Sequence, residues 1–189
     1  MELFGVFSAF GLSASAGLNA YIPLLVVAFL AKFTNLITLK TPWDALTSWW
    51  VIGLLIVLSL VEFFADKFPA VNHINDLIQT FVRPTAGAVA FAASANVITE
   101  IHPVLSLGLG LLIAGGVHAT KTLAVRPAVT ATTGGAGNIP VSILEDVVST
   151  LLSILSVVVP VVIACVLVIV TSWIIFRLLR HSRSHTAAA

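Results

Sequence analysis

Charged side chains are scarce in this sequence. Asp, Glu, Lys and Arg together make up 9% of its 189 residues, whereas soluble domains carry about 25%. Hydrophobic residues make up 59%, and the mean hydropathy is +1.11. A soluble fold of this size could not cover its surface with so few charges, whereas lipid is a natural solvent for an apolar surface. We therefore expect an integral membrane protein and not a soluble globular domain.

Signatures of enzymes and cofactor sites are also missing. The single cysteine, Cys165, lies in an apolar run and cannot form an internal disulfide, so we interpret it as a core or lipid-facing residue. His73, His102 and His118 lie on separate segments without zinc-ligand spacing. The chain has no GxSxG motif, no Cys/His pairing and no GK[ST] after its glycines. With a net charge of +1 as well, the sequence predicts no cofactor, metal site, catalytic site or nucleic-acid partner.

The first hydrophobic run covers about residues 3–31 and ends at Lys32. A membrane-spanning helix needs about 20 such residues. The run lacks a basic start and exceeds the roughly 7–15 residues of a signal-peptide core, so we interpret it as a retained span. Pro23 is expected to kink or divide it.

Further hydrophobic runs follow along the chain. Pro84 is expected to end a short amphipathic helix over 71–83, and Pro160 divides the last run. The fold class expected is all-α: a polytopic transmembrane helical bundle of about five spans, with 71–83 and 141–159 as re-entrant, interfacial or crossing helices. The later runs cover 48–65, 85–101, 104–124 and 141–179.

The two ends of the chain suggest an orientation. Arg177, Arg180 and Arg183 place the basic tail, residues 180–189, in the cytoplasm. Counting five crossings back puts the N-terminus outside. We expect residues 1–179 to form one transmembrane domain in the lipid bilayer, and a chain this small to assemble as a homo-oligomer.

Two segments suggest an internal duplication. Gly11–Val26 and Gly110–Val125 agree at six of their 16 positions. Three expected crossings separate them, so halves covering 5–101 and 104–179 would form an inverted repeat, as in many transporters. The alternative is a chance match, because Gly, Ala, Leu and Val are common in membrane sequences.

Charged groups inside the apolar region are the main candidates for function. Each costs about 2.5–3.5 kcal/mol at the bilayer centre, so those retained there are expected to pair and to line a pathway. We expect Asp76 to pair with Lys121, and Asp146 with Arg83. These charged groups include Glu62, and the candidates for the pathway are Asp66, Lys67, Asp76, Arg83, His118, Lys121, Arg126, Glu145 and Asp146.

Several of these charges also have an ordinary interpretation. Asp66 and Lys67 can mark the aqueous end of a span, and Lys121 can extend to the membrane interface. Asp76 and Arg83, seven residues apart, can belong to the solvated face of a helix. His118 can serve as a proton relay or only as a hydrogen bond within the bundle.

The stretch TATTGGAGN, residues 130–138, is the most informative loop. Its glycines free the backbone to present N–H or C=O groups, and its threonines supply hydroxyls. Asn138 and Ser142 can cap the helix that follows. We expect the loop to line a cavity, and the alternative is an ordinary aqueous loop. The candidate residues are Thr132, Thr133, Gly134, Gly135 and Asn138.

The motifs GLSASAGLNAYIPLL, VEFFADKFPAVNHINDLIQTFVRPTAGA and VHATKTLAVRPAVTATTGGAGNIPVSILED give the chain a resemblance to a known family. The sequence resembles the bacterial membrane proteins grouped as domain of unknown function 4126, over about residues 5–178. This resemblance implies an all-helical fold in the bacterial cell (inner) membrane and no known cofactor. It implies no particular activity.

We expect a small transporter or channel-like protein for an ion or small polar solute, with proton coupling through Asp76, Asp146 or His118. One alternative is a lipid scramblase or lipid-carrier translocase, whose pathway would be open to the membrane on one side. Another is a non-transporting subunit of a membrane complex, whose polar residues would satisfy one another and leave no cavity. An intramembrane enzyme acting on a lipid is a further alternative, disfavoured by the missing catalytic residues.

Overall fold

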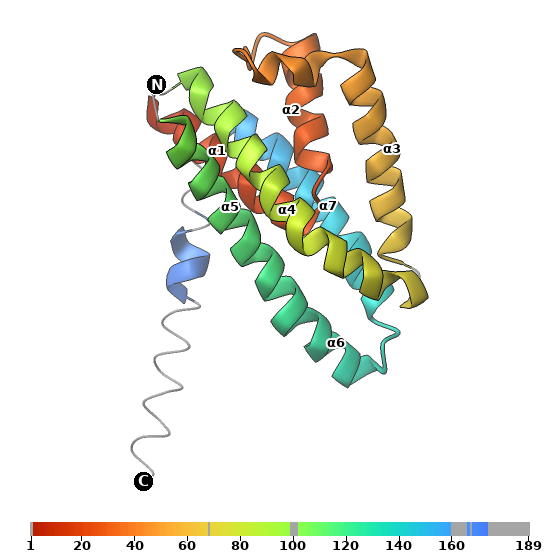
Figure 1. Ribbon diagram of the computed structural model, residues 1–189. Coiled ribbons are helices and arrows are strands. Elements are labelled where there is room, and N and C mark those ends of the chain that lie inside the picture. The colour runs from red at the N-terminus through yellow and green to blue at the C-terminus, as the bar shows by residue number, and fades with distance from the viewer. Residues whose placement is uncertain (1, 68, 99–101, 160–165, 167, 174–189) are drawn as a thin grey trace, which may run out of the picture.

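The computed structural model describes residues 2–67, 69–98, 102–159, 166 and 168–173 (Figure 1). The described part of the chain is helical and contains no strand, which confirms the all-α class. The 3-10 turn η1 (Trp43–Thr47) precedes α3, and the π-helical turn η2 (Lys121–Val125) joins α5 to α6. The α-helices are α1 (Glu2–Leu18), α2 (Ile22–Phe33), α3 (Trp49–Ala65), α4 (Pro69–Ile98), α5 (Pro103–Thr120), α6 (Arg126–Thr133) and α7 (Asn138–Val158).

Small residues let the central helices approach closely. Helices α1, α4 and α5 pack against one another, and α7 packs on α1 and α2. A Cβ added to Gly110 would lie 2.7 Å from the Cα of Ala88, and one added to Gly17 would lie 2.6 Å from the carbonyl oxygen of Ala114. Helices in lipid gain contact area from such close packing. The core is therefore built mostly from Ala, Gly and Ser and not from large apolar side chains.

Hydroxyl groups join α1 to α7. The Ser15 hydroxyl lies 2.8 Å from that of Ser149 and 2.6 Å from that of Ser153. Serines recur along the buried face of α7, at positions 142, 149, 153 and 156. These small side chains combine close approach with hydrogen bonds across the interface.

The first hydrophobic run is divided, as expected, but the break lies before Pro23. Helix α1 ends at Leu18, and α2 begins at Ile22. Pro23 lies in the first turn of α2, where a missing N–H costs nothing. Asn19 causes the break, because its side-chain oxygen accepts hydrogen bonds from the backbone N–H groups of Tyr21 and Ile22.

The prediction that Pro84 ends a short helix is wrong. Helix α4 runs without interruption through Pro84, from Pro69 to Ile98. A proline inside a helix removes one backbone hydrogen bond. The loss is offset by tertiary contacts, because Arg83 immediately before it is bound to two carboxylates and α4 packs on both α1 and α5.

The helix that begins at Pro103 is longer than expected. It continues past residue 124 through η2 into α6 and ends at Thr133. The expected loop is thereby reduced to the turn at residues 134–137. Helix α7 ends at Val158, just before Pro160 as expected. Most of the segment after Pro160 and all of the basic tail, residues 180–189, lie outside the described residues.

The two segments with similar sequences do not have the opposite directions of an inverted repeat. The hydroxyl of Ser13 donates to the carbonyl of Gly110, and Gly17 lies against Ala114, so α1 and α5 run in the same direction. The expectation of opposite directions is wrong because the break after Leu18 turns one expected span into two helices. That break adds one reversal of the chain, which is visible in Figure 1.

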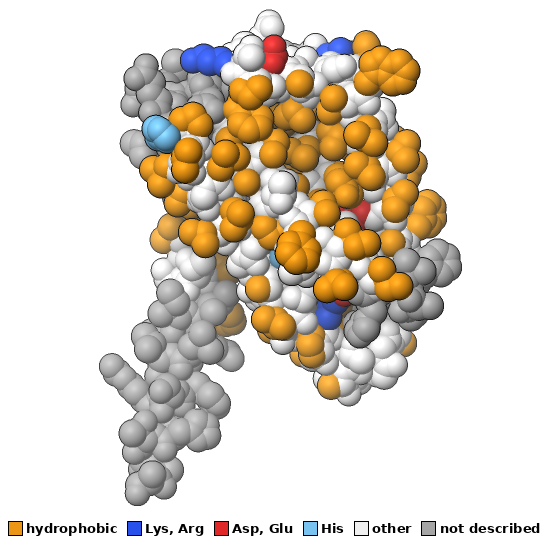
Figure 2. All heavy atoms as spheres, viewed as in Figure 1, with side chains coloured by type: hydrophobic (Ala, Val, Ile, Leu, Met, Phe, Trp, Pro, Cys, Tyr) orange, Lys and Arg blue, Asp and Glu red, His pale blue; other side chains and the backbone are white. Residues whose placement is uncertain are grey.

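The surface is strongly apolar. Two helical stretches, Pro103–Thr133 and Asn138–Val158, are long and apolar enough to cross a membrane, and only 22% and 28% of their most apolar windows are buried. Helix α3 also exposes large side chains, such as Trp50 at 89% and Leu54 at 57%. Figure 2 shows hydrophobic side chains over most of one face, with basic and acidic side chains at its upper edge and a few others lower down.

Candidate functional site: a buried charge cluster

Charged side chains from four parts of the fold meet inside one end of the bundle. They come from the end of α3, the first half of α4, the π-helical turn and the start of α7. Five of the eight acidic and four of the nine basic residues of the chain belong to this charge cluster. Its members are Glu62, Asp66, Lys67, Asp76, Arg83, Lys121, Arg126, Glu145 and Asp146.

Glu62 and Arg83 form the innermost pair. Both side chains are 0% exposed, and the Arg83 Nη2 atom lies 2.9 Å from Oε1 of Glu62. The Nε atom of Arg83 donates to the same oxygen at 3.1 Å. The backbone N–H of Ala20, at the tip between α1 and α2, also donates to this carboxylate. A charge this deeply buried is tolerated only with such a set of partners.

Asp66 is the centre of the cluster. Its Oδ2 atom lies 3.3 Å from Arg83, 3.4 Å from Lys121 and 3.3 Å from Arg126. The Asn75 amide donates to its other oxygen at 2.7 Å. Asp66 lies in the connection after α3. Burial alone would raise the pKa of its carboxyl group, but the three surrounding cations lower this pKa below its ordinary value.

The π-helical turn explains how Lys121 and Arg126 reach the same carboxylate. Residues five apart in an α-helix point about 140° away from each other. In η2 the backbone N–H of Arg126 bonds instead to the carbonyl of Lys121, five residues earlier. The wider turn places the two residues one above the other on the buried side. Such local π-helices are frequent at functional sites.

The outer pairs differ from those expected. Arg126 lies 2.8 Å from Asp76, and Lys67 lies 3.1 Å from Asp146. The expected pairs of Asp76 with Lys121 and of Asp146 with Arg83 are therefore wrong. Lys121 does not extend to an interface, since its side chain is only 2% exposed. The π-helical turn, which sequence patterns did not reveal, directs Arg126 to Asp76.

His118 makes hydrogen bonds within the bundle. Arginine can only donate, so the contact of 3.2 Å from Arg83 identifies Nδ1 of His118 as the acceptor. The hydroxyl of Thr80 donates to the backbone of Asp76 and lies 3.2 Å from Nε2 of His118. This arrangement fits a neutral histidine with its proton on Nε2.

The threonine- and glycine-rich stretch lies outside the cluster. Thr132 and Thr133 donate to carbonyls of their own helix, α6. Gly134 and Gly135 end that helix with φ of 62° and 92°. Asn138 donates to the Thr130 hydroxyl and does not cap α7. Ser142, the other expected cap, lies inside α7 within 3.5 Å of Asp66.

Sequence reasoning named Glu62, which stands alone in the apolar run SLVEFFA, among the charged groups. It overlooked two buried amides that bind the cluster. Asn19 holds Asp146 at 3.0 Å, and Asn75 holds Asp66. These two amides have no comparable signal in the sequence, because only the fold brings them to the carboxylates.

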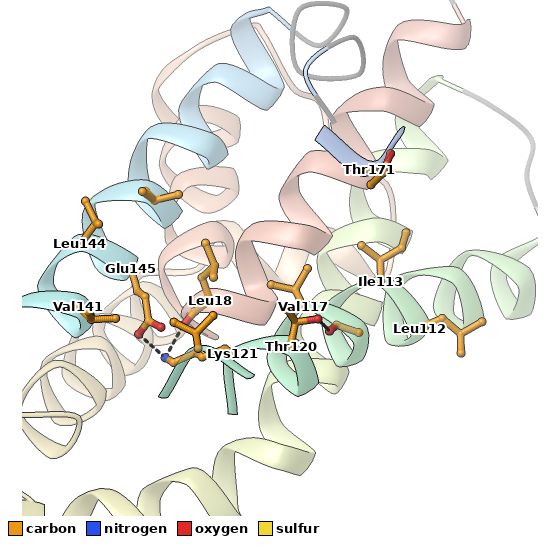
Figure 3. Close-up of a pocket in the computed structure, with 13 residues that line it drawn as sticks. Leu18, Leu112, Ile113, Val117, Thr120, Lys121, Val141, Leu144, Glu145 and Thr171 are labelled. Carbon is orange, nitrogen blue, oxygen red and sulfur yellow. Dashed lines mark hydrogen bonds and ion pairs between the residues drawn. The ribbon is translucent and has the colours of Figure 1, made fainter. Parts of the chain in front are cut away.

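A groove between α5 and α7 leads from the surface to the cluster. It has a volume of about 650 Å³ and is lined mainly by apolar side chains, among them Leu112, Val117 and Leu144. Figure 3 shows Lys121 at its inner end, pointing toward Glu145 and the backbone of Leu18. The distance between Nζ of Lys121 and Oε2 of Glu145 is 2.7 Å. The groove therefore has apolar walls and an ion pair at its end.

A family model described as "Domain of unknown function (DUF4126)" matches residues 6–181. The chain belongs to this family. The match covers all the charge-cluster residues and both walls of the groove. Neither the curated proteins nor the solved structures gave a match.

Proposed function

We propose that this DUF4126 protein is a multi-pass membrane protein with about five spans, located in the bacterial cell membrane. The outward-facing apolar side chains of α3, α5 and α7 support this location. At about 1.5 Å per residue, the 17 residues of α3 extend about 26 Å, close to the roughly 30 Å of a bilayer core. Trp49 and Trp50 then lie at one interface.

The protein binds a lipid from the surrounding bilayer and guides its polar head toward the charge cluster. The observation that carries this proposal is the groove between α5 and α7, which is open at the surface and apolar along its walls. Ligand pockets have volumes of about 300–1,000 Å³, a range that includes this groove. A lipid chain suits such walls, and the Lys121–Glu145 pair suits a polar head.

The other candidate functions require structural features that differ from this groove. An enclosed route for an ion or small solute needs polar walls, whereas the walls of this groove are mainly apolar. A purely structural subunit would need no groove leading to its buried charges. A lipid-handling protein, such as a scramblase or lipid-carrier translocase, uses both the groove and the charges.

Gly116 permits a specific test. It lines the groove, and a Cβ added there meets no atom within 4 Å, so a leucine side chain can start from this position and occupy part of the groove. Gly108 on the same helix is equally free of neighbours but does not line the groove, so Gly108→Leu is the matched control.

The measurement is transbilayer exchange of a fluorescent phospholipid in proteoliposomes. We expect exchange by the wild type and by Gly108→Leu, and a loss of at least several-fold in Gly116→Leu. Equal exchange by the two leucine variants, or no exchange above empty vesicles by the wild type, would contradict the proposal.

Transport of an ion or small polar solute is the second candidate. The network of ion pairs that extends from partly exposed Asp76 to fully buried Glu62 favours it. Flux of protons, alkali cations and halide through the same vesicles tests this candidate. Flux that is lost in a folded Asp76→Asn/Asp146→Asn double variant would support it, and absence of flux would remove it.

A further inference from the structure

The inner end of the groove has a charge pattern that selects among lipid heads. A cation, Lys121, and an anion, Glu145, contact each other there at 2.7 Å. We infer that the groove binds a zwitterionic lipid whose head contains both a phosphate and a primary ammonium group. This inference rests on the proposed lipid function and adds the class of head group.

Insertion of such a head replaces one ion pair with two. The phosphate takes the place of Glu145 at Lys121, and the ammonium takes the place of Lys121 at Glu145. The net charge of the cluster does not change, so no uncompensated charge becomes buried. Lys121 stays in position, because Asp66 and the Leu18 carbonyl hold it from behind, each at 3.4 Å.

Lipid head groups with a net charge fit the inner end of the groove less well. The charge cluster contains five carboxylates and four cations, so an anionic lipid would increase an existing negative excess. A cationic amphiphile would have to compete for Glu145 with Lys121, which is held by three contacts. Only a head that carries both signs provides each of the two side chains with a new partner.

A primary ammonium group fits better than a quaternary one. The Nζ atom of Lys121 approaches the Glu145 carboxylate to 2.7 Å, a distance that the small head of a primary ammonium allows. A trimethylammonium group has no N–H and cannot approach a carboxylate as closely. The groove should therefore distinguish ethanolamine from choline heads.

The test is competition among lipids with identical acyl chains. Purified protein in detergent is mixed with equal amounts of phosphatidylethanolamine, phosphatidylcholine, phosphatidylglycerol and phosphatidic acid, and native mass spectrometry measures which lipids stay bound. We expect several-fold more bound phosphatidylethanolamine than any other lipid. Equal retention of all four, or a preference for another head, would overturn the inference without any variant being needed.

A carboxylate in the groove and one outside it provide a pair of variants. Glu145 lines the groove, whereas Asp44 is exposed in η1 and belongs to neither the groove nor the charge cluster. In Glu145→Gln the ratio of bound phosphatidylethanolamine to phosphatidylglycerol should fall toward one, and in Asp44→Asn it should stay at the wild-type value. An unchanged ratio in folded Glu145→Gln would also overturn the inference.

The same experiment separates the two proposals. If no lipid is retained, or if Gly116→Leu retains as much as Gly108→Leu, the lipid function itself fails. If retention depends on Gly116 but shows no preference for ethanolamine, only the inference about the head group fails.

Discussion

Lys121 and Arg126 are five residues apart, yet both contact the same oxygen atom, Oδ2 of Asp66, at 3.4 and 3.3 Å. The π-helical turn between them makes this convergence possible. Asp66 also contacts Arg83, so one carboxylate joins α3, α4 and the α5–α6 segment. The fold around the cluster should therefore depend strongly on this side chain.

Substitution Asp66→Asn should destabilise the protein strongly. It leaves three cations with reduced compensation, and breaking a buried ion pair costs about 3–5 kcal/mol. Thermal unfolding in detergent measures the effect. The control is Asp44→Asn, because Asp44 is exposed in η1, where its carboxylate accepts a hydrogen bond from the Thr41 hydroxyl at 3.4 Å. Equal stability of the two variants would contradict the central role of Asp66.

The stabilising effect of Asp66 should also depend on pH. Its folded-state pKa is lowered, so its contribution is fully present above the ordinary aspartate pKa of about 3.9 and is lost as the pH falls through the folded-state value. The difference in stability between the wild type and Asp66→Asn should therefore narrow below about pH 4. A difference that stays constant between pH 7 and pH 3 would show that the carboxylate charge is not responsible.

Glu62 and Arg83 should show energetic coupling. Glu62→Gln removes one of the two carboxylates bound to Arg83, and Arg83→Gln removes the arginine bound to Glu62. The double variant should lose less stability than the sum of the two losses, with a coupling of about 0.5–3 kcal/mol. Chemical unfolding of the four proteins gives this value. Simple additivity would mean that the two side chains do not interact as their 2.9 Å contact indicates.

Close packing between α4 and α5 should make Gly110 sensitive to a single methyl group. Because the added Cβ would lie 2.7 Å from the Cα of Ala88, Gly110→Ala forces the helices apart and should cost about 1–3 kcal/mol. At Gly108 the Cβ meets no atom within 4 Å, so Gly108→Ala should gain up to about 1 kcal/mol of helix propensity. Melting temperatures of the two variants should move in opposite directions.

The turn after α6 should require glycine for its backbone conformation. Gly134 has a φ of 62°, where an L-residue with a side chain costs about 1–2 kcal/mol. Gly134→Ala should lower the stability by this amount, although no atom lies within 4 Å of the added Cβ. Lipid exchange by the folded variant should be unchanged, since Gly134 lies outside both the cluster and the groove. A loss of exchange without unfolding would give this turn a functional role.

The sequence by itself determined the helical class and several helix boundaries. Hydrophobic runs of sufficient length predicted α3 closely, and Pro160 predicted the end of α7. The scarcity of charge in these runs also directed attention to the residues that form the cluster, because a charge retained in an apolar segment needs a partner. Asp66, Arg83, Lys121 and Glu145 were found in this way.

The tertiary structure alone decided which charges pair and where the chain turns. Pro84 was expected to end a helix, but packing on α1 and α5 and the ion pairs of Arg83 carry α4 through it. Lys121 and Arg126 share one carboxylate because of a π-helical turn. A single turn of this kind has no characteristic sequence periodicity. Local sequence patterns indicate which charged residues need an oppositely charged partner. The choice of partner depends on contacts between segments far apart in the chain, such as Asn19 with Asp146.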